Sequence, residues 1–66
     1  MIVIDKTVES VDVRLTKDEL VLLNNALNEV CNGVDFDDSE FHARLGSDRR
    51  EAQQLLREIG DLCRNR

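Results

Sequence analysis

The sequence predicts a small α+β domain in which an N-terminal β segment precedes three helices. Three observations predict this class: apolar and polar residues alternate near the N-terminus, apolar residues later recur every three or four positions, and three capping patterns mark helix starts. With 66 residues the chain forms one domain, residues 1–66, and is too short for two. Because a chain of this size builds only a thin core, self-association is expected.

The β segment covers residues 1–15. Val11, Val13 and Leu15 alternate with charged residues, which is the period-two pattern of a strand with one buried face. Two arrangements are open: a hairpin within one chain, or one strand that pairs with a second subunit. Because a two-stranded ribbon is marginal in water, either arrangement is expected to pack on the helices or on another chain.

The hairpin arrangement needs a turn, and Glu9-Ser10 is the predicted one. This turn places Val8 opposite Val11 and Asp5 opposite Arg14, which gives an apolar pair and an oppositely charged pair across the strands. Neither turn residue is the Gly or Asn that two-residue turns prefer.

The first helix is predicted over 17–32. Thr16 and Glu19 form a capping box, in which the hydroxyl accepts from the third helical amide and the carboxylate accepts from the cap amide. The apolar stripe along this helix has helical spacing, and Gly33 ends it. The stripe consists of Leu20, Leu23, Ala26, Leu27, Val30 and Cys31.

Two further helices are predicted, over 38–45 and over 48–64. The shorter one begins at Asp37, has Phe36 and Phe41 in its two staple positions, and ends at Gly46. The longer one begins at Asp48, with Ser47 as a competing cap. Its apolar face consists of Ala52, Leu55, Leu56, Ile59, Leu62 and Cys63, and Gly60 lies at the edge of that face. The first and third helices are expected to carry the core.

The cysteines and the N-terminus bear on location. The N-terminal residues lack the pattern of a secretory signal, and no apolar run approaches the roughly 20 residues of a membrane span. A cytoplasmic location without a membrane association is therefore expected. In a reducing compartment Cys31 and Cys63 are expected to be free thiols on apolar helix faces, as buried structural cysteines are.

The residues that could carry chemistry do not form a recognisable site. Asp35, Asp37, Asp38 and Glu40 fail the calcium-loop pattern, and helix capping accounts for Asp37 and Glu40. His42 and the two cysteines are too few and too scattered for structural zinc or for a nucleophile with its base. We therefore expect no enzymatic activity, no catalytic residue, no cofactor and no metal.

One segment resembles the helix-turn-helix family of DNA-binding modules. From Phe41 to Leu55 it has a short helix, a glycine at the turn and apolar residues where the family buries them. The resemblance implies that the third helix enters the major groove, where arginine reads guanine and glutamine reads adenine. His42 and Ser47 depart from the residue types that the family prefers at these positions. The residues implied in DNA binding are Arg49, Arg50, Gln53 and Gln54.

The charge distribution favours a protein partner over nucleic acid. The net charge is −5, and residues 1–43 hold ten acids and three bases, whereas residues 44–66 hold four acids and six arginines. An acidic surface opposes the phosphate backbone and can complement a basic partner. The sequence therefore predicts a small acidic, non-catalytic protein-interaction module, either a homodimer or a regulator or inhibitor that docks on a larger partner. A helix-turn-helix-like transcriptional regulator is the alternative.

Overall fold

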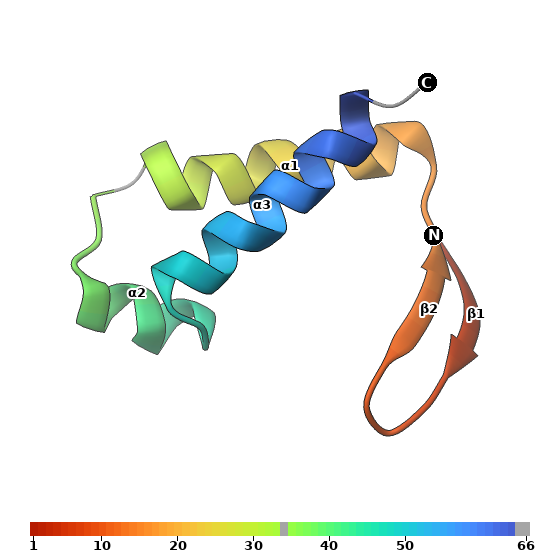
Figure 1. Cartoon of the computed structure of the whole chain (residues 1–66), viewed down its shortest axis with the longest axis horizontal. Helices are drawn as coiled ribbons and strands as arrows, with labels where there is room; N and C mark the ends of the chain where they lie inside the picture. Colours follow the sequence, from red (N-terminus) through yellow and green to blue (C-terminus); the bar gives the residue numbers. More distant parts are fainter. Residues whose placement is uncertain (34, 65–66) are drawn as a thin grey trace.

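The computed structural model describes residues 1–33 and 35–64. A two-stranded antiparallel sheet at the N-terminus precedes three α-helices, which confirms the predicted α+β class. Figure 1 shows α1 and α3 side by side, with the hairpin at one end of this pair and α2 at the other. The elements are β1 (Ile2–Lys6), β2 (Val11–Arg14), α1 (Lys17–Asn28), a π-helical turn (Glu29–Gly33), α2 (Asp38–Leu45) and α3 (Arg49–Arg64).

The hairpin forms within one chain, but its register differs from the predicted one. Val3 lies opposite Val13 and Lys6 lies opposite Val11, whereas Asp5 faces Asp12 rather than Arg14. A bulge between Val3 and Asp5 shifts the alternation by one residue. Because Ile4 is the extra residue of the bulge, Val3 lies opposite Val13, and Val3, Val11 and Val13 share one face of the ribbon.

The turn explains the altered register. It centres on Val8 and Glu9, and the side chains of Thr7 and Ser10 close it. The Thr7 amide donates to the Ser10 carbonyl at 2.8 Å, and the Ser10 amide donates to the Thr7 hydroxyl at 3.0 Å. These bonds fix the turn one position earlier than predicted and leave Val8 fully exposed at the tip.

The first helical segment combines α1 with a wider last turn. The predicted capping box is present, since the Glu19 amide donates to the Thr16 hydroxyl and the Thr16 amide donates to the Glu19 carboxylate. At the other end the chain continues through the π-helical turn as far as Gly33, as predicted for the end of the helix. Cys31 lies in this turn and is buried.

The caps of α2 and α3 decide their starts. Asp37 accepts from the Glu40 amide at 2.7 Å, and Asp48, not Ser47, accepts from the Glu51 amide at 2.8 Å. At the end of α2, Gly46 adopts the left-handed conformation with φ 71° and donates to the His42 carbonyl. The predicted bounds of α2 are confirmed. The predicted start of the third helix at Asp48 is also confirmed, with Asp48 as the cap and Arg49 as the first residue of α3.

The core is smaller than predicted and lies where α2, α3 and the π-helical turn meet. Its three buried members are Cys31, Phe41 and Ala52. The expectation that the first and third predicted helices carry the core is confirmed in part, because Cys31 belongs to the first predicted helix (17–32) and Ala52 to the third. The central ring, Phe41, comes instead from α2. Partly buried side chains around this centre are Leu27, Val30, Phe36 and Leu56.

The expectation that the β segment packs on the helices is wrong for the described part of the chain, where neither strand lies against a helix. Only two residues, Leu15 and Thr16, connect β2 to α1, and Thr16 is extended with ψ 163°. This conformation turns the hairpin away from the α1–α3 pair, as Figure 1 shows. The radius of gyration is 13.3 Å, whereas about 11 Å is usual for a compact chain of this length.

Candidate protein-binding surface

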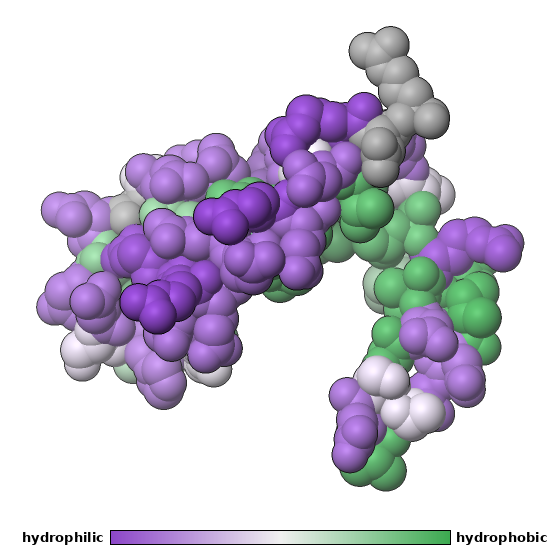
Figure 2. All heavy atoms as spheres, viewed as in Figure 1, coloured by the Kyte–Doolittle hydropathy of each residue, from purple (hydrophilic) through white to green (hydrophobic). Residues whose placement is uncertain are grey.

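The hairpin presents an uncovered apolar face, which we name the valine face (Val3, Val11 and Val13). Directly paired side chains and side chains two positions apart lie on the same face of a sheet. The three valines are 56%, 50% and 40% exposed. In Figure 2 apolar surface is visible on the hairpin away from the helices.

The helices form a second uncovered apolar surface, which we name the apolar groove. It has a volume of about 420 Å³, and no charged or hydrogen-bonding side chain lines it. Leu23 and Leu55 remain 46% and 49% exposed there, although both belong to the stripes predicted to form the core. The lining residues are Leu23, Ala26, Leu27, Val30, Leu45, Leu55 and Ile59.

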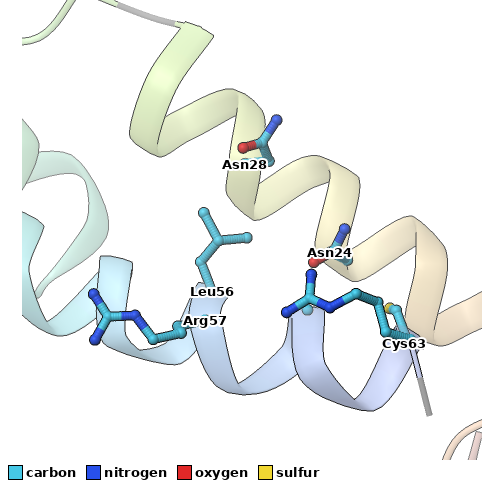
Figure 3. A pocket seen from close by; sticks show the side chains of 7 residues that line it. Asn24, Asn28, Leu56, Arg57 and Cys63 are labelled. Atoms are coloured by element: carbon cyan, nitrogen blue, oxygen red, sulfur yellow. The ribbon is translucent and has the colours of Figure 1, made fainter.

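A different, polar pocket of about 440 Å³ also lies between α1 and α3. Figure 3 shows the amides of Asn24 and Asn28 on α1, with Leu56 and Arg57 on α3. Two of the three asparagines of α1 therefore line this pocket. The arginines of the pocket already pair along α3, Arg57 with Gln54 and Arg64 with Asp61.

Gly60 lies beside this pocket. A Cβ added there would lie 3.6 Å from Oδ1 of Asn24, which is ordinary van der Waals contact. The nearest atoms belong to side chains rather than to another backbone. A close approach of two backbones therefore does not require this glycine.

Arg49 holds the small core together. Its guanidinium donates to the carbonyl of Cys31 at 3.2 Å and to that of Phe36 at 2.5 Å, and it lies 4.7 Å from the centre of the Phe41 ring. Nε also lies 3.7 Å from a carboxylate oxygen of the exposed Asp38. One side chain thus ties the start of α3 to the π-helical turn and to the chain entering α2.

The four residues of the DNA-binding alternative have unequal positions. Arg50, Gln53 and Gln54 are exposed on the first two turns of α3, where a partner could reach them. The Arg49 side chain is 27% exposed and its donors face the two carbonyls. The sequence did not predict this structural role of Arg49, because the carbonyls that its side chain contacts lie 13 and 18 residues away along the chain.

The remaining candidates for chemistry are dispersed. Cys31 and Cys63 are free thiols, the first buried and the second half-buried. His42 is exposed, and Glu40 pairs with Arg44 at 3.1 Å instead of completing the capping box. Within residues 1–33 and 35–64, no three His, Cys, Asp or Glu side chains are grouped closely enough to hold a metal ion.

The carboxylate of Glu19 has a lowered pKa at the point where the N-terminus meets α1. The ammonium group of Met1 donates to the Glu19 carboxylate at 2.7 Å, and the Thr16 amide adds a second hydrogen bond. These contacts lower the pKa of Glu19 from 4.5 to about 2, because both favour the ionised carboxylate. Glu19 therefore joins the base of the hairpin to the first turn of α1.

The comparisons with known proteins provide no relative. No family model, no curated protein and no solved structure matches the chain. In the described part of the chain, none of the helices is both long enough and apolar enough to span a membrane.

Proposed function

We propose that this chain is a small acidic, non-catalytic protein-interaction module whose partner is a second copy of itself. The observation that carries the proposal is the hairpin: neither of its strands lies against a helix, and its valine face is open. Two strands without a third layer are marginally stable in water. A partner that covers the valine face supplies that layer.

The amount of exposed surface supports this proposal. The chain exposes 5497 Å². A compact folded chain of 7.6 kDa exposes about 4,300 Å², so the excess is about 1,200 Å². A standard-size interface takes about 800 Å² from each partner. The excess is therefore large enough to form one side of a stable dimer.

Charge limits where such an interface can lie. Each copy carries a net charge of −5, so two copies repel one another at low ionic strength. Contact through charged surfaces of like sign is unfavourable, whereas the apolar groove carries no charge. We therefore expect the groove to lie inside the interface, and we expect added salt to strengthen the dimer.

Sedimentation equilibrium across a range of protein concentrations tests the dimer directly. Twice the chain mass is the expected result, together with tighter association at higher salt. Leu55→Glu places a charge in the groove and is expected to give a monomer that keeps its helices. Gln54→Glu, one residue along on the exposed side of α3, is the matched control and is expected to remain dimeric. A wild-type monomer at all concentrations would contradict the proposal.

DNA binding through α3 is the second candidate, and the exposure of Arg50, Gln53 and Gln54 favours it. Its salt dependence is opposite, because DNA binding releases counterions and weakens as salt rises. A titration with mixed-sequence duplex DNA at low salt, followed through backbone amide shifts, tests it. Saturable shifts at these three residues that disappear with salt would support DNA binding, and unchanged spectra would exclude it.

A further inference from the structure

Within one molecule, the valine face and the apolar groove lie too far apart to contact one another. The hairpin leaves the molecule at the N-terminal end of α1, whereas the groove lies along the later part of α1 and the π-helical turn, from Leu23 to Val30, and includes Leu45 of α2. Figure 1 shows the hairpin and α2 at opposite ends of the α1–α3 pair. The groove therefore needs an occupant from outside the chain.

We propose that in the homodimer the valine face of each copy lies in the apolar groove of the other copy. This inference rests on the proposed function, since it names the surfaces that the dimer joins. A two-fold axis across the middle of α1 reverses the direction of the helix. The partner's hairpin then comes to the end of α1 where the groove lies, and the same contact forms twice.

The two surfaces agree in size. From Val11 to Val13 the strand rises by about 7 Å. Along α1 and the start of the π-helical turn the groove extends from Leu23 to Val30, which is a rise of about 10 Å. The two strands, about 5 Å apart, also bring Val3 beside Val13, so that three branched side chains cover one patch.

The opposite face of the hairpin is unsuited to burial. Asp5 and Asp12 lie directly opposite one another there, and two neighbouring carboxylates need water. Edge-to-edge pairing through β1 is also disfavoured, because the bulge after Val3 interrupts that edge. Only the valine face combines an apolar surface with a regular strand behind it.

The rim of the groove also matches the charge on the valine face. Lys6, opposite Val11, is a cation at the margin of that face. Glu51 lines a neighbouring depression that shares Leu27, Leu45 and Leu55 with the groove. A hairpin seated in the groove thus brings a cation toward an acidic rim.

A complementation experiment tests the exchange of hairpins. Val13→Lys alters only the valine face, and Leu55→Glu alters only the groove. Each variant alone is expected to be monomeric with unchanged helical circular dichroism, because an unpaired charge in the contact raises the Kd about 100-fold or more. An equimolar mixture is expected to form a heterodimer, since it contains one unaltered contact and one contact in which the two introduced charges have opposite signs.

Other dimers predict a different result. If hairpin packed on hairpin, Leu55→Glu alone would remain dimeric, and if groove packed on groove, Val13→Lys alone would remain dimeric; in neither case would mixing the two variants produce a heterodimer that the separate variants cannot match. A wild-type dimer with no heterodimer in the mixture would therefore overturn the exchange while leaving the proposed function intact. A wild-type monomer would overturn both.

A second measurement needs no variant. In a dimer made from isotope-labelled and unlabelled wild-type chains, filtered nuclear Overhauser spectra report only contacts between chains. We expect signals between Val13 methyl groups of one chain and Leu55 methyl groups of the other. Signals from Val13 to Val13 of the second chain, in place of these, would contradict the proposal.

Discussion

The hairpin and the helical body are both rich in apolar residues, but only the helical body buries any of them fully. Eight of the first 15 residues are apolar, a higher proportion than in the chain as a whole. None of these eight residues is buried, whereas the helical body buries Cys31, Phe41 and Ala52. Apolar content therefore does not determine which region forms a core.

The physical difference lies in what each element leaves open. A helix satisfies its backbone internally and exposes one stripe, which two other helices can cover. A two-stranded ribbon has two faces and two edges, and nothing within itself can cover them. The body is expected to stand by itself, whereas the hairpin depends on an additional layer.

The largest expected effect comes from Phe41→Ala, because this ring is fully buried at the centre of the core. The loss is expected to be about 3–5 kcal/mol of unfolding free energy. For a core of three buried residues this removes most of the stability. Urea denaturation monitored by helical circular dichroism measures it.

The matched change in the other region is Val8→Ala at the exposed tip of the hairpin. A change of less than about 0.5 kcal/mol is expected there. Equal effects of the two substitutions would break the distinction between the body and the hairpin.

The next effect separates two adjacent arginines. Arg49→Ala removes hydrogen bonds to the carbonyls of Cys31 and Phe36 and the contact with the Phe41 ring, so a loss of about 2–3 kcal/mol is expected. Arg50→Ala is expected to change stability by less than about 0.5 kcal/mol, because this side chain is exposed. Thermal and urea unfolding of both variants provides the comparison. A more damaging Arg50→Ala would show that Arg49 does not hold the core.

The sequence predicted the helices well because their signals are local. A cap and the amide that it binds lie three residues apart, as in Thr16 with Glu19, Asp37 with Glu40 and Asp48 with Glu51. Helix ends at Gly33 and Gly46 follow from the same kind of short-range chemistry. No distant part of the chain needs to be known for these features.

The hairpin register and the core were less predictable because they depend on contacts that the local pattern does not contain. The bulge after Val3 and the hydroxyl contacts of Thr7 with Ser10 decide the register. In the helices, the periodic stripes correctly identified an apolar surface but assigned it to the interior. Leu23 and Leu55 belong to those stripes and remain about half exposed in the groove. A periodic apolar stripe indicates that its residues pack against apolar partners, but it does not indicate whether those partners belong to the same chain.

A smaller effect distinguishes two glycines of the helical body. Gly60→Ala is expected to stabilise the protein by up to about 1 kcal/mol, because alanine favours the helix and its Cβ meets only ordinary contacts. Gly46→Ala is expected to destabilise by about 1 kcal/mol, since φ 71° strains any residue with a Cβ. Melting temperatures measured in parallel give the sign of each change. A lower melting temperature for Gly60→Ala would indicate that α1 and α3 approach more closely at this point.

The smallest effect concerns Glu19, where the base of the hairpin meets the body. The ammonium group of Met1 and the Thr16 amide hold the pKa of Glu19 at about 2 in place of 4.5. A lowered pKa in the folded state means that the carboxylate stabilises the fold above about pH 4.5 and that this contribution is lost as the pH falls toward 2. Carbon-detected NMR titration of the Glu19 carboxyl group measures the pKa directly.

Acetylation of the N-terminus provides the control, since it removes the ammonium charge and leaves the Thr16 cap in place. The pKa of Glu19 is then expected to rise toward 4.5, because the largest cause of the shift is gone. If the pKa stays near 2 after acetylation, the cap alone accounts for the shift and the N-terminus does not anchor the hairpin. If it rises, this one ion pair helps to set where the hairpin leaves α1, and with it the direction in which the valine face is presented to a partner.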